Sequence, residues 1–227
     1  VMAEVTFCRV RVEVENRAGS VADGWGGIFL ADFWSFPTPK IDHATRDRAM
    51  RSVVDRYEPV VRGLREYGHP IDLALSLDGE MDRILRDVSA ELSLPVPLNR
   101  LTGLVCASPF DAALHDAFGN VNGIGTYDGY GADWMDHDLG RDLGPEFRGK
   151  YPGDYVKPAY DPTVPIFHLV GGLDKLTRHE IDAGDPRDAW PVSLDDWIER
   201  QGLFCLKVKL LGTDLAWDLD RIARVTA

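Results

Sequence analysis

The stretch GLFCLKVKLLGTD, residues 202–214, carries two lysines inside an otherwise apolar run. Alternate residues of a strand share a face, so Lys207 and Lys209 project together, while Val208 and Leu210 project from the opposite face. One interpretation is a half-exposed strand with two solvated ammonium groups, since lysines usually stay in water. The other is a barrel strand whose outer face packs on helices and whose inner face holds both lysines. When two ammonium groups lie this close together, each disfavours the charge of the other. One of them can then give up its proton and serve as a base.

Strands and helices alternate around these lysines. The run VPIFHLV, residues 164–170, is almost continuously apolar, which is typical of a buried parallel strand. A short helix is expected over residues 193–202, with Ser193 as its N-cap and Gly202 as its stop. Another helix is expected over residues 213–227. The order strand, helix, strand, helix predicts two βα units.

The first half of the chain has a different pattern. Residues 5–16, VTFCRVRVEVEN, alternate apolar and polar side chains and predict a half-buried strand, which pairs with a second strand at 24–30. Three helices are expected to follow. The first covers 42–64 with a kink at Pro59, the second uses apolar positions from 81 to 92, and the third opens at Ser108 with Pro109 and stops at Gly119.

The pattern divides the chain into two domains. Residues 1–160 predict an α+β domain, whose last segment, 120–160, has little periodicity and is interpreted as a linker or an insertion. Residues 161–227 hold the two βα units.

The bulk composition narrows the class of protein. The chain has 227 residues, 44% of them hydrophobic, and a formal net charge of −12. Nucleic acids and anionic membranes both need a positive surface, so neither is expected as a partner. Three cysteines with apolar neighbours indicate buried thiols in a reducing compartment. No apolar run reaches the ~20 residues of a membrane span and no signal peptide is visible, so a cytoplasmic protein is expected.

Three stretches, in their order, carry a resemblance to a known family. The hairpin region 12–27, VEVENRAGSVADGWGG, is similar to a cap hairpin that ends in G-W-G-E, with Gly27 in place of the glutamate. Residues 108–123, SPFDAALHDAFGNVNG, are similar to the helix motif S-A-x-D-x-A-L-W-D-x-x-G-K-x-x-G. Residues 204–225 are similar to a K-x-K strand followed by a G-x-D turn and a helix. The chain thus resembles the enolase superfamily, in particular its mandelate racemase and muconate lactonizing enzyme group.

The resemblance implies both a fold and a reaction. The fold would be an α+β cap domain followed by the start of a (β/α)-barrel of the enolase type. The reaction would be Mg²⁺-dependent abstraction of the proton α to a carboxylate, giving dehydration, racemisation, epimerisation or cycloisomerisation of a small carboxylic acid such as a sugar acid. Lys209 would be the base and Lys207 its modulator.

The resemblance also implies functional residues that lie outside residues 1–227. The acidic Mg²⁺ ligands and the second acid/base would follow residue 227, because a complete barrel needs about eight strands. The chain is therefore interpreted as a fragment that holds the first two βα units. A homo-oligomer is expected.

Several further residues are candidates for a site. His168 lies near the end of the first barrel strand, where a substrate contact or a structural histidine are the alternatives. Trp34 and Phe36 lie in the loop after the second strand. The alternatives for these two residues are that they line the substrate pocket or that they pack against other side chains of the domain. His115 and Asp116 are interpreted as structural. The acidic run 133–142 predicts a solvated loop more readily than a metal site.

Two other functions remain open from the residues alone. Lys207 or Lys209 could form a Schiff base in an aldolase built on an α/β barrel. The chain could also be a non-catalytic binding or structural member of the family. Trapping with borohydride and a carbonyl substrate separates the aldolase from the enolase type, because only the aldolase forms a covalent adduct.

Overall fold

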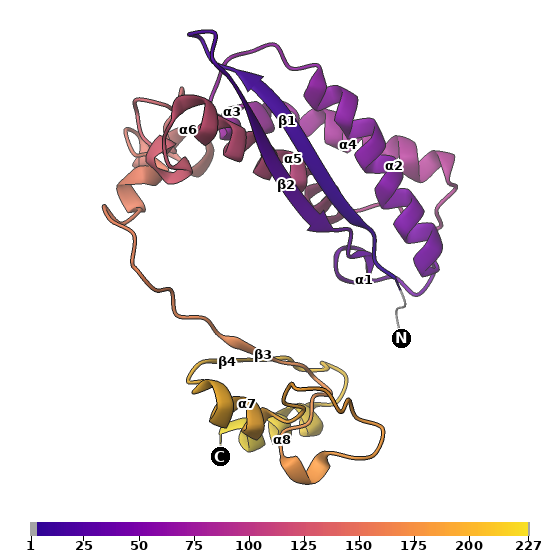
Figure 1. Ribbon diagram of the computed structural model, residues 1–227. Helices are drawn as coiled ribbons and strands as arrows, with labels where there is room; N and C mark the ends of the chain where they lie inside the picture. Colours follow the sequence, from indigo (N-terminus) through magenta and orange to yellow (C-terminus); the bar gives the residue numbers. More distant parts are fainter. Residues whose placement is uncertain (1–3, 227) are drawn as a thin grey trace. The chain divides into compact units, whose positions relative to one another are not determined.

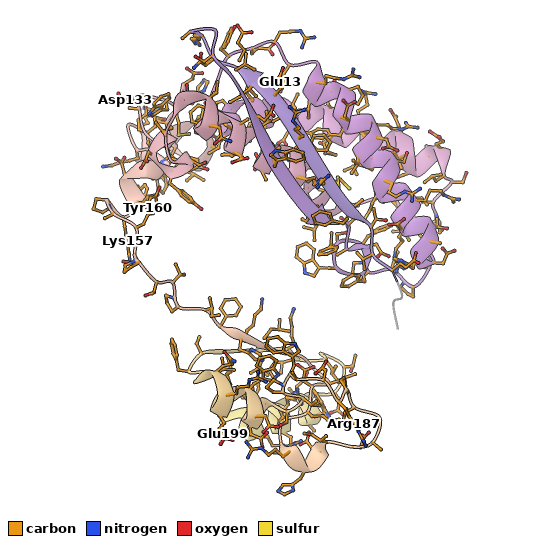
Figure 2. The ribbon with its side chains drawn as sticks, viewed as in Figure 1. Glu13, Asp133, Lys157, Tyr160, Arg187 and Glu199 are labelled. Atoms are coloured by element: carbon orange, nitrogen blue, oxygen red, sulfur yellow. The ribbon has the colours of Figure 1, made fainter. Side chains whose placement is uncertain are left out.

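The computed structural model describes residues 4–226, which fall into two compact units (Figure 1). The first is Val1–Lys157 and the second is Pro158–Ala227. Lys157, labelled in Figure 2, therefore ends the first unit, close to the expected boundary after residue 160. No helix in the described part of the chain is both long and apolar enough to cross a membrane.

The first unit is an antiparallel hairpin packed on helices. Strands β1 and β2 pair with each other, and β2 leads into the helices of the unit. The elements in chain order are β1 (Phe7–Glu15), β2 (Val21–Phe29), α1 (Asp32–Ser35), α2 (His43–Arg62), α3 (Pro70–Ser76), α4 (Asp78–Glu91), α5 (Arg100–Asn122) and α6 (Gly140–Leu143). Residues 120–160, expected to lack periodicity, end α5 and then form short 3-10 turns around α6.

The predicted hairpin is confirmed, and its register sets the two faces. Val12 lies opposite Gly24 in an antiparallel pair. The valines of β1 are half-buried and pack against the hydrophobic core, whereas Arg9 and Arg11 are exposed on the other face. The second strand begins at Val21, three residues before the expected start at Gly24.

Helix α5 lies directly against the backbone of β2. A Cβ atom added to Gly26 would stand 2.0 Å from the Pro109 carbonyl oxygen, and one added to Gly24 would stand 2.2 Å from the Ala113 carbonyl oxygen. Real Cβ atoms do not approach backbone this closely, so both positions require glycine. The two glycines therefore allow the helix and the strand to pack in backbone contact.

The predicted boundaries of α5 are wrong at both ends. The helix begins at Arg100, and Asn99 caps it by accepting a 2.8 Å hydrogen bond from the Thr102 N–H. Pro109 lies inside the helix and offers no N–H to the Val105 carbonyl, which instead accepts a 3.0 Å bond from the Ser108 hydroxyl. That local bond explains why the Ser-Pro pair continues the helix where the sequence predicted its start.

The end of α5 follows from backbone conformation. The helix runs past Gly119 to Asn122, and Gly123 caps it in the left-handed region with φ 66°. Glycine is favoured there because it lacks a Cβ. The expected stop at Gly119 was therefore four residues too early.

The core of the first unit lies between α2, α4, α5 and the hairpin. Helix α2 follows its prediction closely, since Asp42 caps it through a 2.7 Å bond from the Thr45 N–H and Pro59 lies inside it. Met50 and Val53 are fully buried on its inner face. Helix α4 begins at Asp78, three residues before the first apolar position used to predict it.

Helix α3 was not predicted, and a buried histidine caps it. The Nδ1 atom of His69 accepts a 3.2 Å hydrogen bond from the Ile71 N–H, so this nitrogen carries no proton. The ring is 1% exposed and packs 5.0 Å from the Phe118 ring and 5.3 Å from the Tyr130 ring, between ring centroids. Burial, assisted by His115, lowers the pKa of His69 to about 4. The folded chain thus holds this imidazole neutral.

This histidine predicts a loss of stability in mild acid. The pKa of His69 is about 4 in the folded chain against an ordinary value of 6.5, so below pH 6.5 the unfolded chain takes up a proton that the folded chain refuses. Stability from this group is fully present above pH 6.5 and falls as the pH drops toward 4, by up to about 3 kcal/mol. Urea unfolding of the chain and of His69→Asn at pH 7 and pH 4.5 measures the difference.

Asparagine keeps an acceptor for the Ile71 N–H but does not titrate, so it is the matched control. The unfolding free energy of the variant should fall less between the two pH values than that of the unchanged chain. Equal falls would show that His69 does not set this pH dependence.

The second unit contains two strands, each followed by a helix. Strands β3 (His168–Val170) and β4 (Leu206–Val208) pair in parallel, and helices α7 (Leu194–Gln201) and α8 (Leu215–Thr226) accompany them. Ser193 and Gly202 flank α7 as expected, with Gly202 left-handed at φ 61°. The Ser193 side chain makes no capping bond, because its hydroxyl donates to the carboxylates of Asp195 and Asp196.

The first strand of this unit is shorter than its apolar run. Only the last three residues of 164–170 form a strand, and Val164 is 77% exposed. Pairing with β4 begins at His168 opposite Leu206, and no strand among residues 4–226 pairs with the residues before His168. The apolar run 164–170 therefore predicted a strand longer than the segment that β4 pairs with.

Candidate functional site

Strand β4 places the two lysines on the face away from the small core of the second unit. Leu206 packs against the core formed by Val170, Leu176 and Leu194, and Val208 is half-buried on the same side. Lys207 is exposed. The arrangement is that of a strand with one covered apolar face and one open face that carries the lysines.

Lys209 continues this alternation one residue beyond the end of β4. Its backbone N–H donates a 2.8 Å hydrogen bond to the Val170 carbonyl, which extends the parallel ladder. Two residues apart in extended backbone, Lys207 and Lys209 share a face, and both are exposed. The structure therefore brings together the two lysines that the sequence singled out.

The open face around the lysines is apolar. Leu169 lies opposite Lys207 in the register, so the two share a face, and Leu169 is exposed. The Lys207 ammonium stands 5.3 Å from the centroid of the Phe167 ring in a cation–π contact. A negatively charged ligand that met both ammonium groups would at the same time cover this apolar surface.

His168 does not lie with the lysines. It pairs with Leu206 and points to the covered face, where its ring is 5.1 Å from the ring of Trp197 on α7. Because successive strand residues point to opposite faces, His168 and Lys207 are separated by the sheet itself. The structure gives His168 a packing contact with a helix, the structural alternative, and we leave it out of the site.

The loops that follow the two strands are fixed by helix α8. Asp218 accepts 2.9 Å hydrogen bonds from the N–H groups of Leu211 and Gly212, just after Lys209. Arg221 donates a 2.8 Å bond to the Asp174 carbonyl and a second bond to the Gly171 carbonyl, after β3. Both side chains are buried. Together they hold the ends of the strands in one place.

Sequence reasoning predicted a helix here but not this role. Leu215 and Leu219 are 74% and 58% exposed, and the helix buries Asp218 and Arg221 instead. Of the apolar residues of α8, Val225 packs against the core of the second unit. The only signal in the sequence is the spacing of Asp218 and Arg221, three residues apart on one side of the helix. A hydrophobicity pattern does not reveal that these two side chains bond backbone groups of the loops.

Trp34 and Phe36 belong to the first unit. Trp34, in α1, is 57% exposed and can meet a ligand, whereas Phe36 is 3% exposed and is part of the hydrophobic core. Phe36 thus has the packing role that was the alternative for both residues.

A buried ion network at α1 was also missed by sequence reasoning. The Asp32 carboxylate is fully buried; His43 Nδ1 lies 3.0 Å from its Oδ1, and Arg46 Nε donates a 2.6 Å bond to its Oδ2. Burial alone raises the pKa of Asp32, but the bonds from His43 and Arg46 outweigh it and hold the pKa below its usual value. The network fastens the end of β2 to the start of α2.

His43 completes this network through both of its ring nitrogens. Its Nε2 lies 3.1 Å from the Glu4 carbonyl, so both ring nitrogens face acceptors and both can donate only when the ring is protonated. The hydrogen bond to Asp32 accordingly raises the pKa of His43.

The acidic run 133–142 forms local bonds. Asp138 accepts from the N–H groups of Gly140 and Gly149, at 2.9 and 2.6 Å, and these backbone bonds lower its pKa. His137 and Arg141 both contact Asp72. Within residues 4–226, no group of three or more histidine, cysteine, aspartate or glutamate side chains is placed to hold a metal ion.

The chain was compared with protein-family models, with curated proteins and with solved structures. No protein-family model, no curated protein and no solved structure matches the chain.

Proposed function

We propose that this chain belongs to an enzyme of the enolase-superfamily type that removes the proton α to the carboxylate of a small acid, such as a sugar acid. Lys209 is the base in this proposal, and Lys207 is the neighbouring cation. Dehydration, racemisation or epimerisation would be the net reaction.

The supporting observation is the alternation of β4. Its apolar residues face the core of the second unit, and Lys207, with Lys209 just after the strand, projects from the open face beside an exposed apolar surface. In a (β/α) barrel the outer face of each strand packs on helices, and residues at the C-terminal ends of the strands meet the substrate. Lys209 follows the last residue of β4 and therefore lies at such an end.

The chemistry is a proton transfer. The amine of Lys209 takes the α-proton, the C–H bond breaks, an N–H bond forms, and the electron pair passes to the substrate carboxylate as an enolate. The ammonium of Lys207 adds positive charge on the face where that negative charge develops.

The resemblance to the enolase superfamily implies a bound Mg²⁺ ion. Residues 4–226 contain no cluster of three or more histidine, cysteine, aspartate or glutamate side chains that could hold it. We therefore derive no step through a metal from this chain.

The test is α-proton exchange by the full-length protein in deuterated water. Gluconate, galactonate and mandelate are the probes, and ¹H NMR follows loss of the α-proton signal with Mg²⁺ and after its removal with EDTA. The proposal predicts Mg²⁺-dependent exchange for at least one acid of this class. A borohydride-stable adduct with a carbonyl substrate would favour the aldolase instead. If the protein shows no α-proton exchange and calorimetry detects no Mg²⁺ binding, the result would favour a non-catalytic protein.

A further inference from the structure

The loops that follow β3 and β4 lie against each other beside Lys209. The two strands are parallel, so both loops leave from the same end of the sheet. A Cβ atom added to Gly172 would stand 3.0 Å from Leu211 Cδ2 and 3.8 Å from the Lys209 carbonyl oxygen. The loop after β3 therefore touches the backbone from which the Lys209 amine extends.

Asp218 of α8 holds the loop after β4 with both of its carboxylate oxygens. Its Oδ1 accepts the Leu211 N–H and its Oδ2 accepts the Gly212 N–H, each at 2.9 Å. Gly212 has φ 73°, in the left-handed region that glycine adopts readily. The turn thus directs two successive N–H groups toward one carboxylate, as in the backbone nests that bind anions. A side-chain amide has one oxygen and would match only one of the two donors.

Arg221, one turn further along α8, holds the loop after β3. Its guanidinium donates to the Gly171 carbonyl and, at 2.8 Å, to the Asp174 carbonyl. It also lies 5.5 Å from the centroid of the Trp217 ring. Asp218 and Arg221 are only 7% and 4% exposed. A buried charge is costly unless it is hydrogen-bonded, and here both charges bond the backbone of the two loops.

We infer that Asp218 and Arg221 are positioning residues for the Lys209 amine. The inference rests on the proposed function, in which that amine is the base. The Lys209 N–H bonds the Val170 carbonyl at the end of β3, and Asp218 fixes the chain two residues beyond Lys209. Arg221 fixes the loop that follows Val170. One helix therefore holds the Lys209 Cα atom from both strands.

A fixed Cα atom matters because the lysine amine sits on a flexible four-carbon stem. A misplacement of about 1 Å at a reacting group can lower a rate by a factor of about 10². Loosening either loop displaces the amine and slows proton transfer. Substrate affinity changes little, because both positioning side chains are buried and do not meet the substrate.

A purely structural role for the two residues makes a different prediction. If they only stabilised the fold, weakening them would reduce the fraction of folded protein. Each folded molecule would still exchange α-protons at the unmodified rate. A positioning role instead lowers the rate per folded molecule.

The experiment compares Asp218→Asn with the unmodified full-length protein and with Asp220→Asn. Asp220 lies on the same helix and is exposed, so it is the matched control. Exchange of mandelate, gluconate and galactonate α-protons in deuterated water gives kcat and KM, and circular dichroism at the assay temperature gives the folded fraction. Asp218→Asn should lower kcat per folded molecule by about 10- to 100-fold and change KM by less than about threefold. Asp220→Asn should change neither.

Hydrogen exchange followed by mass spectrometry tests the loop contacts without using activity. Peptides that cover residues 206–214 should take up deuterium at least about tenfold faster in Asp218→Asn, and at the unmodified rate in Asp220→Asn. Arg221→Lys is the second variant, for the case in which Asp218→Asn does not fold. It keeps the charge and loses the planar pair of donors, so it should lower kcat per folded molecule by at least about threefold.

The outcomes separate this inference from the proposed function. If Lys209→Ala abolishes exchange while Asp218→Asn and Arg221→Lys keep the unmodified kcat per folded molecule, the positioning role is wrong and Lys209 remains the base. Unchanged deuterium uptake over 206–214 in Asp218→Asn would also overturn it. If Lys209→Ala exchanges at the unmodified rate, or the unmodified protein exchanges none of the three acids, the proposed function fails and this inference fails with it.

Discussion

Replacing Lys209 with alanine is expected to lower the rate of α-proton exchange by a factor of about 10²–10⁴, the usual contribution of a general base. The amine projects from the open face of the β3–β4 sheet and the backbone of Lys209 is fixed by its bond to Val170, so alanine removes the proposed proton acceptor without disturbing the strand. The measurement is the rate of deuterium incorporation into the probe acid by ¹H NMR, in the full-length protein.

Two other lysine variants define what this loss means. Lys150→Ala removes an exposed lysine of the first unit and should leave the rate unchanged. Lys207→Ala should reduce the rate less than Lys209→Ala, because it removes a neighbouring charge and leaves the base. If Lys209→Ala exchanges the α-proton at the unmodified rate, Lys209 is not the base for that substrate.

The second large effect concerns stability. Asp32→Asn is expected to lower the free energy of unfolding by about 3–5 kcal/mol, because it removes the buried carboxylate that pairs with His43 and leaves the Arg46 guanidinium beside a neutral amide. Chemical denaturation of the first unit, followed by circular dichroism, measures the change.

A surface ion pair of the same unit supplies the matched control. Asp23 contacts Arg11 at 2.5 Å, but both side chains are substantially exposed, so Asp23→Asn should cost at most about 1 kcal/mol. An Asp32→Asn variant no less stable than Asp23→Asn would show that the buried network does not fasten β2 to α2.

The sequence predicted well those elements whose signals are local. The alternation of Val10, Val12 and Val14 predicted β1, and the cap at Ser193 with the stop at Gly202 predicted α7. The lysine pair was also found from alternation alone, because a period of two decides which residues share a face of a strand.

The failures come from side-chain bonds that sequence patterns do not show. The start of α5 was missed because the Ser108 hydroxyl satisfies the carbonyl that Pro109 leaves free, which a rule about proline position does not include. The role of α8 was missed because Asp218 and Arg221 bond backbone groups of loops that are distant in the sequence or follow another strand. Asp32 gave no signal at all, since its partners His43 and Arg46 come from another helix.

The most direct test of the account is whether an amine at position 209 restores proton exchange. In a Cys205→Ala background, which removes the exposed cysteine, Lys209→Cys should lose exchange. Alkylation with 2-bromoethylamine then rebuilds a lysine-like amine on that sulfur and should raise the rate by at least about tenfold, whereas iodoacetamide should not. Recovery with the amine reagent alone is the predicted result. A variant that exchanges normally before alkylation, or that gains nothing from the restored amine, would contradict the assignment of Lys209 as the base.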